Sequence, residues 1–165
     1  MNIDKSTVFQ DAKHNFIKFD DVLNRVLNFI DEKPEYKYKL SIGTDSMTYN
    51  ESYFVLAIVL HRVGNGGIYF YKKFVEQPVK DLRTKLYTET ELSINTTNLI
   101  VDELIEKDVY ILDKLNLSIH LDIGTNGPTK DLINELEGWV KAIGYNYEIK
   151  PDSYAASVVA DKYSK

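Results

Sequence analysis

The sequence predicts an α/β protein in which helices pack on a mixed β-sheet. Three apolar segments in the first half of the chain are separated by short polar or glycine-rich turns, which is typical of antiparallel strands. In the second half, segments with helical spacing alternate with short apolar segments, which is typical of parallel strands joined by helical crossovers. After an N-terminal helix, the expected order of elements is therefore β-β-β-α-β-α-β-α.

The first half of the chain begins with an amphipathic helix and continues as a strand meander. Residues 19–30 place Val22, Val26 and Ile30 at helical spacing, and we expect Asp20 to cap this helix. The second strand has an unbroken apolar centre, which indicates burial on both faces. A turn rich in glycine leads into the third strand. The three expected strands are residues 38–45, 53–61 and 68–71.

The second half begins with a long helix at residues 81–107, which contains no glycine or proline to break it. A strand follows that runs through Asp122, and a loop at 124–128 then leads to a helix that Gly144 ends. We expect the remaining elements to be that helix at 129–143, a short strand at 145–150, and a terminal helix that starts at 151–153 and runs through Lys165.

Length and composition indicate one domain that contains no disulfide. The chain has 165 residues, of which 44% are apolar, and it has no apolar run long enough to span a membrane. We expect a cytoplasmic protein with a single domain over residues 1–165, made of an N-terminal helical extension at 1–36 and a core at 37–165. The absence of cysteine excludes thiolate nucleophiles and cysteine-bound zinc, which favours hard cations held by oxygen ligands.

The charge balance limits the kinds of partner. A formal net charge of −5 counts against a protein whose affinity comes from a broad basic surface that neutralises phosphates. A nucleic-acid partner remains compatible with this charge, because divalent ions bound to acidic side chains would add local positive charge.

Two aspartates stand at equivalent places in two expected strands. Side chains alternate along a strand, so Asp45 shares the smaller, more polar face of its strand with Gly43. In the same way, Asp122 shares the more polar face of its strand with His120. If the two strands are parallel neighbours, their carboxylates are neighbours too. Carboxylates repel one another, and the usual reason to bring them together is a hard divalent cation.

Helices supply further candidate ligands. Glu89 and Glu91 lie on different sides of the long helix, and we favour Glu89 because it is closer to the buried side, with Glu91 as the alternate. In the terminal helix we favour Asp161, because a carboxylate near a helix C-terminus opposes the dipole and suggests a compensating cation. Asp152 is the alternate there, although it is also a good N-cap.

Other polar groups near these positions each have two possible roles. His120 is either a hydrogen-bonded core residue or a residue that assists the acidic site. The loop at 124–128 either binds a phosphate or is a crossover turn. The cations expected to flank the acidic cleft, each of which could equally be a surface charge, are Arg83, Lys85 and Lys150.

The order of these acidic positions resembles that of the ribonuclease H-like superfamily. The sequences of four segments are similar to those of the YkuK-type bacterial family, which is predicted to be nuclease-related on fold grounds. These segments are IGTDS at 42–46, LYTETELS at 86–93, IHLDI at 119–123 and KPDSYAASVVAD at 150–161. This resemblance covers roughly residues 37–165. It implies a three-layer fold with a mixed five-stranded sheet, in which the first three strands are antiparallel and the first, fourth and fifth are parallel, plus an extra N-terminal helix.

The resemblance also implies an activity. Four carboxylates, Asp45, Glu89, Asp122 and Asp161, would be both the catalytic residues and the ligands of two Mg²⁺ or Mn²⁺ ions that promote phosphodiester cleavage by water, with Asp45 as the bridging ligand. The substrate would be RNA or DNA, and the protein would be a possible homodimer built through its N-terminal helix. Two family features are missing from the sequence: a basic substrate-binding protrusion, and a flexible histidine loop before the last helix. The alternative is a non-catalytic nucleic-acid or protein binding module on the same fold.

Overall fold

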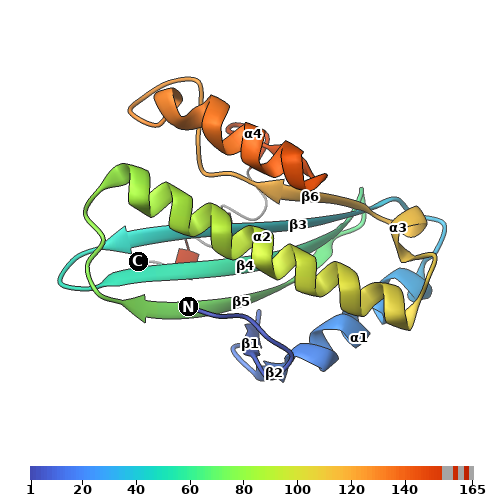
Figure 1. The fold of residues 1–165 in the computed structure, drawn as a ribbon. Helices are drawn as coiled ribbons and strands as arrows, with labels where there is room; N and C mark the ends of the chain where they lie inside the picture. Colours follow the sequence, from blue (N-terminus) through green and yellow to red (C-terminus); the bar gives the residue numbers. More distant parts are fainter. Residues whose placement is uncertain (154–157, 160–161, 164–165) are drawn as a thin grey trace.

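A seven-stranded mixed β-sheet forms the centre of the protein, with the strand order β2-β1-β5-β4-β3-β6-β7 (Figure 1). The structure is a computed structural model that describes residues 1–153, 158–159 and 162–163. The expected α/β class and the mixed sheet are confirmed. No helix in the described part of the chain is both long enough and apolar enough to cross a membrane.

The element bounds agree with the sequence pattern through most of the chain. The strands are β1 (Val8–Asp11), β2 (Phe16–Lys18), β3 (Tyr38–Thr48), β4 (Ser52–Arg62), β5 (Gly67–Glu76), β6 (Asn116–His120) and β7 (Asn146–Glu148). The α-helices in the described residues are α1 (Phe19–Glu32), α2 (Leu82–Lys107), α3 (Ile111–Lys114) and α4 (Ile133–Ile143), and a 3-10 turn, η1 (Lys130–Leu132), precedes α4.

The sheet contains seven strands where five were expected, because the N-terminal segment is not only helical. Strands β1 and β2 form an antiparallel hairpin, and β1 also pairs with the outer edge of β5 through Gln10 and Asp11. These strands have only four and three residues, so neither is long enough to show an alternating pattern in the sequence. The hairpin adds two strands to the β5 edge of the sheet.

The middle of the sheet combines antiparallel and parallel pairing. Strands β3 and β4 pair antiparallel along their whole length, and β4 pairs with β5 in the same way. On its other side β3 pairs parallel with β6, and β6 pairs parallel with β7. Strand β4 is buried along most of its length, as its unbroken apolar centre predicts.

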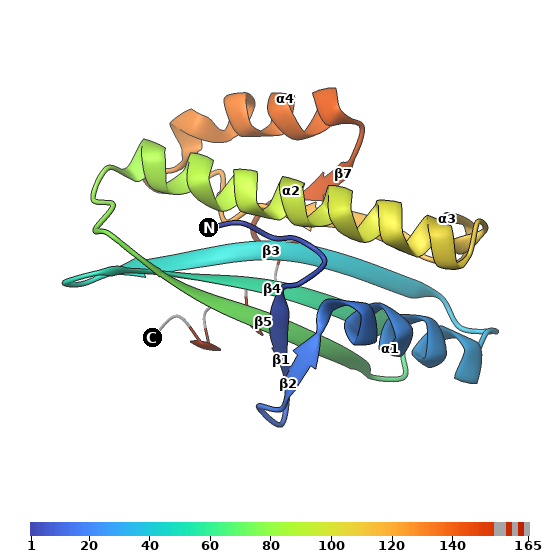
Figure 2. The same cartoon turned by 60° about the horizontal axis from the view of Figure 1, so that its bottom comes forward.

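Helices α1, α2 and α4 cover one face of the sheet. The main core cluster joins α1 and α2 to this face through buried residues such as Val22, Ile58 and Ile100, and a second cluster joins α2 and α4 to β6. In Figure 2, α2 and α4 lie together on the same side of the sheet. On the opposite face, Tyr163 stacks on Tyr71 of β5 with ring centroids 3.8 Å apart. Described residues of the C-terminal segment therefore contact the face of the sheet opposite to α2.

Several expected boundaries are shifted by local chemistry. The N-cap of α1 is Lys18 and not Asp20, which lies in the first turn and pairs with Lys107 of α2 at 2.7 Å. Helix α4 begins at Ile133, after the 3-10 turn, and ends as expected at Gly144, whose φ of +98° is in the left-handed region that glycine tolerates. Strand β6 ends at His120, so Asp122 lies two residues beyond it.

Candidate metal centre

Asp45 and Asp122 come from neighbouring parallel strands in matching register. Strands β3 and β6 pair as Ser41 with Ser118 through to Gly43 with His120, where the ladder stops. Continuing the same register by two residues would place Asp122 opposite Asp45. The observed register of β3 and β6 therefore brings Asp45 and Asp122 side by side, as the similar residue patterns of the two strands predict.

The end of β6 leaves room at this edge of β3. Strand β3 continues to Thr48, but its pairing with β6 stops at Gly43, so the next residues of β3 have no neighbouring β6 residue in the ladder. A side chain from the helix face can therefore reach the level of the sheet here. This interruption in the ladder is the local feature that allows acidic groups from three elements to meet.

Glu89 reaches this position from α2. It is buried, with 3% of its surface exposed, and Ser46 Oγ donates a hydrogen bond of 2.5 Å to Glu89 Oε1. One turn further along α2, Ser93 Oγ lies 2.8 Å from Thr44 Oγ1 of β3. Thr44 and Ser46 alternate with Asp45 along β3, so they occupy its helix-facing side. Small hydroxyl side chains let the helix approach the strand closely and orient the Glu89 carboxylate.

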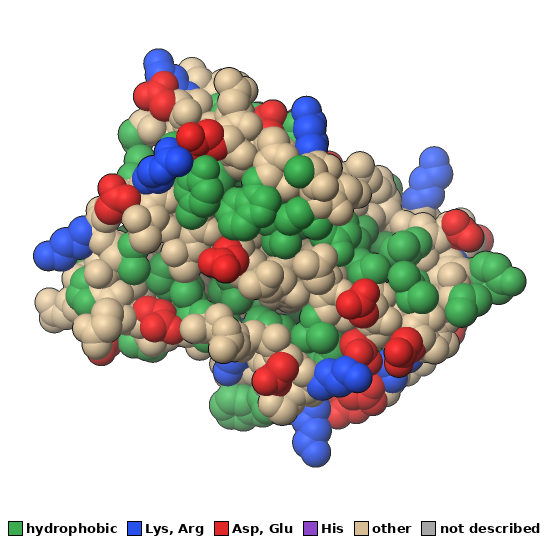
Figure 3. All heavy atoms as spheres, in the orientation of Figure 1, with side chains coloured by type: hydrophobic (Ala, Val, Ile, Leu, Met, Phe, Trp, Pro, Cys, Tyr) green, Lys and Arg blue, Asp and Glu red, His purple; other side chains and the backbone are tan. Residues whose placement is uncertain are grey.

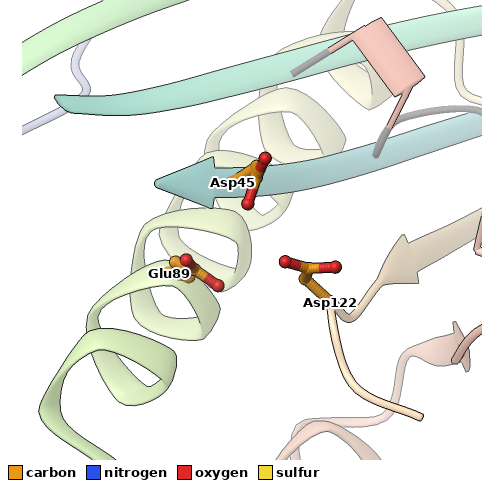
Figure 4. A group of neighbouring side chains, drawn as sticks. All are labelled: Asp45, Glu89 and Asp122. Atoms are coloured by element: carbon orange, nitrogen blue, oxygen red, sulfur yellow. The ribbon is translucent and has the colours of Figure 1, made fainter. Parts of the chain in front are cut away.

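The three carboxylates converge. Asp45, Glu89 and Asp122 each offer one oxygen, and these oxygens all lie within 4.8 Å of one another. Figure 4 shows the three side chains directed toward a common space, with Asp45 on strand β3, Glu89 on helix α2 and Asp122 on the segment after β6. Glu89 is buried, and the other two are partly buried.

Burial and like charge make this cluster electrostatically costly. Burial raises the pKa of Glu89 well above its usual value, and the neighbouring charges of Asp122 and Asp45 raise it further, while the hydrogen bond from Ser46 and the charge of Lys85 act in the opposite direction. A cation bound by the three carboxylates would relieve both the repulsion and the burial cost. Carboxylate oxygens suit hard cations such as Mg²⁺, Mn²⁺ and Ca²⁺, so the donor set fits a divalent ion without selecting one.

Lys150 is a basic side chain in direct contact with the cluster. Its Nζ lies 2.7 Å from Asp122 Oδ1. Its pKa is raised, first by the hydrogen bond to Asp122 and further by the charges of Asp122, Asp45 and Glu89, against the opposing effect of burial. Lys85 adds positive charge near Glu89. Arg83, the third expected flanking cation, instead pairs with Glu135 of α4 at 2.7 Å.

The two alternate ligands do not join the converging carboxylates. Glu91 is exposed on α2 and Asp152 is exposed after β7, and neither belongs to the converging group. Asp161, the favoured fourth ligand, lies outside the described residues.

His120 is buried, and its Nε2 lies 3.3 Å from Glu148 Oε2. Burial lowers the pKa of His120, and the charge of Glu148 only partly opposes this effect. Burial and a lowered pKa are typical of a histidine in the core. They favour the interpretation of His120 as a hydrogen-bonded core residue over a residue that assists the acidic site.

Ser46 is the site residue that the sequence interpretation missed. Its signal was present, because residues 44 and 46 must face opposite to Asp45 on an alternating strand, and both carry hydroxyl groups. A hydroxyl next to a buried carboxylate is a common way to satisfy that carboxylate.

The chain belongs to the ribonuclease H-like family, whose model matches residues 21–165. The match begins inside α1, so it extends further toward the N-terminus than the resemblance expected from residue 37. Among known proteins, the chain is similar to the uncharacterized protein YkuK of Bacillus subtilis (strain 168), with 37% identity over 169 aligned positions that cover 97% of this chain and 98% of that protein. The comparison with solved structures found no significant match. The expected YkuK-type resemblance is confirmed. Because YkuK is itself uncharacterized, this similarity does not assign a reaction.

Proposed function

We propose that this protein is a divalent-metal-dependent nuclease that hydrolyses phosphodiester bonds in nucleic acid. The observation that carries the proposal is the convergence of Asp45, Glu89 and Asp122 within 4.8 Å in a chain of the ribonuclease H-like family. Carboxylates placed this closely serve poorly as independent acids or bases, but they serve well as shared ligands of divalent ions. In this proposal Asp161 is the fourth ligand, and two Mg²⁺ or Mn²⁺ ions are bound.

Each carboxylate has a distinct part in this scheme. Asp45, on β3 and close to the carboxylates of Glu89 and Asp122, would be the ligand shared by both ions. Glu89 is held by Ser46, so its orientation is set before any ligand arrives. Asp122, on the segment after β6, would complete the ligand set, and in the metal-free protein Lys150 contacts one of its oxygens. When bound, the ions would supply a water of lowered pKa and neutralise the charge that develops on the phosphate.

The surface charge is consistent with a site that depends on its ions for phosphate attraction. On the face in Figure 3, which bears α2, the Lys and Arg side chains of the described residues are scattered around the outline and do not gather into one basic patch. The net charge of the chain is −5. Binding of nucleic acid should therefore be weak without divalent ions and should strengthen with them.

A cleavage assay tests the proposal. The wild-type protein should cut at least one of labelled single-stranded, duplex and RNA–DNA hybrid substrates in the presence of Mg²⁺ or Mn²⁺. Asp45→Asn and Asp122→Asn should each lower the rate by roughly a hundredfold or more, because each removes an anionic ligand. Asp113→Asn is the matched control, since it neutralises an exposed carboxylate on α3, beside the beginning of β6 and away from the site.

The second candidate function is a non-catalytic binding module on the same fold. The observation that favours it is the contact between Lys150 and Asp122, which partly neutralises the cluster without any metal. A wild-type protein that binds Mg²⁺ and nucleic acid but cuts none of the substrates would establish this alternative. Dimer formation stays a prediction, which sedimentation equilibrium would measure.

A further inference from the structure

The backbone around Lys150 is tied to the segment that carries Asp122. The N–H of Lys150 donates to the carbonyl of Ile123 at 2.8 Å, and the N–H of Leu121 donates to the carbonyl of Glu148 at 2.9 Å. These two bonds bracket Asp122 on both sides. The register between these two segments therefore places the Lys150 side chain beside Asp122.

A glycine leaves space for this lysine. A Cβ atom added to Gly124 would lie 3.4 Å from Lys150 Cβ and 3.8 Å from its Cδ, so the lysine stem runs along the bare backbone of Gly124. The Lys150 side chain is nevertheless 54% exposed. Its ammonium group can therefore swing into solvent without unpacking the core.

The ammonium group of Lys150 and a divalent cation would compete for the same carboxylate. Lys150 Nζ lies 2.7 Å from Asp122 Oδ1, and Asp122 is one of the three carboxylates that converge. A bound divalent ion needs oxygen ligands at about 2.0–2.6 Å and would repel a positive charge held beside it. Full occupancy of the site by metal therefore requires the ammonium to move away.

We infer that Lys150 is an internal counter-ion of the carboxylate cluster, which holds Asp122 in place before metal binding and must be displaced from Asp122 when a divalent cation binds. This inference rests on the proposed metal site. It gives Lys150 a positioning role and predicts that the residue weakens metal affinity while it stabilises the metal-free protein.

Isothermal titration calorimetry with Mn²⁺ and Mg²⁺, at constant pH and ionic strength, tests the inference in wild type and Lys150→Met. Removing the competing ammonium should lower the dissociation constant by about two- to fivefold, the range expected for a half-exposed ion pair. Without metal, the same variant should melt about 1–3 °C lower than wild type. Lys37→Met is the matched control, because it makes the same charge change just before β3, at the end of the strand away from Asp45.

The outcomes separate this inference from the proposed function. A lower dissociation constant in Lys150→Met but not in Lys37→Met supports it, and so does metal binding that occurs only in Lys150→Met. Equal affinities in all three proteins would overturn the displacement of Lys150 and leave the metal site standing. Absence of metal binding in every protein would overturn both the inference and the proposed metal site.

Discussion

Replacing Glu89 with glutamine should stabilise the metal-free protein at neutral pH. The substitution removes a buried negative charge but keeps the length of the side chain and an oxygen that can accept the Ser46 hydrogen bond. Because burial and the charges of Asp122 and Asp45 raise the pKa of Glu89, the folded state pays a penalty whenever this carboxyl is ionised. Glutamine carries no such penalty.

The distances set the size of the effect. Two unit charges within 4.8 Å repel by roughly 3 kcal/mol at an effective dielectric constant of about 20, and by about 1 kcal/mol in bulk water. The Ser46 hydrogen bond and Lys85 offset part of this repulsion. We therefore expect Glu89→Gln to raise the free energy of unfolding by about 1–3 kcal/mol, or the melting temperature by roughly 2–10 °C.

The effect should grow with pH. An unfolded glutamate titrates near its ordinary value of 4.5, whereas folded Glu89 keeps its proton to a higher pH. The native state therefore binds more protons than the unfolded state between these two pKa values, so wild-type stability falls as pH rises through that window. The difference between Glu89→Gln and wild type should be smallest below the unfolded value and largest above the raised pKa.

Urea denaturation at several pH values, first with a chelator and then with saturating Mg²⁺, measures this dependence. Magnesium should stabilise the wild type more than Glu89→Gln, because the variant has lost an anionic ligand. Glu91→Gln is the control, since Glu91 is exposed on the same helix and should give no change at any pH. A metal-free Glu89→Gln that is less stable than wild type, or whose advantage does not depend on pH, would refute the electrostatic reasoning.

Three further substitutions test other parts of the fold by urea or thermal denaturation. Asp11→Ala should lower the free energy of unfolding by about 1–3 kcal/mol at neutral pH. Arg25 and backbone N–H groups lower the pKa of Asp11 to about 2, despite the opposing effect of burial. The loss of stability should therefore shrink as the pH falls from 3.8 through about 2. Arg62→Met should lower the free energy of unfolding by roughly 2–4 kcal/mol without changing metal affinity. The reason is that the buried guanidinium lies 3.7 Å from the Phe29 ring centroid and donates to the Phe29 carbonyl at 2.6 Å. Gly138→Ala should stabilise α4 by about 0.5–1 kcal/mol, because nothing lies within 4 Å of the added Cβ.

Each of these substitutions has an outcome that contradicts its reasoning. An Asp11→Ala variant whose stability deficit is unchanged down to pH 2 would show that the charge of Asp11 is not what stabilises the β1–β2 turn. A shift in metal affinity in Arg62→Met would mean that the end of β4 at Arg62, which pairs with Tyr38 at the start of β3, is coupled to the carboxylate cluster. A Gly138→Ala variant that loses stability would mean that this exposed position of α4 requires glycine.

Local patterns in the chain were sufficient to predict most of the elements around the site. The unbroken apolar centre of β4, the long helix without glycine or proline, and Gly144 as a helix terminator each have a cause within a few residues. The hairpin of β1 and β2 could not be predicted in this way. Strand β1 joins the sheet by pairing with β5, which lies some sixty residues away along the chain.

The sequence by itself determined that Asp45 and Asp122 have equivalent positions, because the alternation of side chains along a strand is a local property that the order of residues displays directly. Only the tertiary structure decided that β6 ends at His120, that Glu89 of α2 reaches Ser46 of β3 beyond that point, and that Lys150 lies against Asp122. These contacts join segments distant in sequence, and their distances depend on how helix, strand and loop pack together. Local periodicity carries no information about that packing.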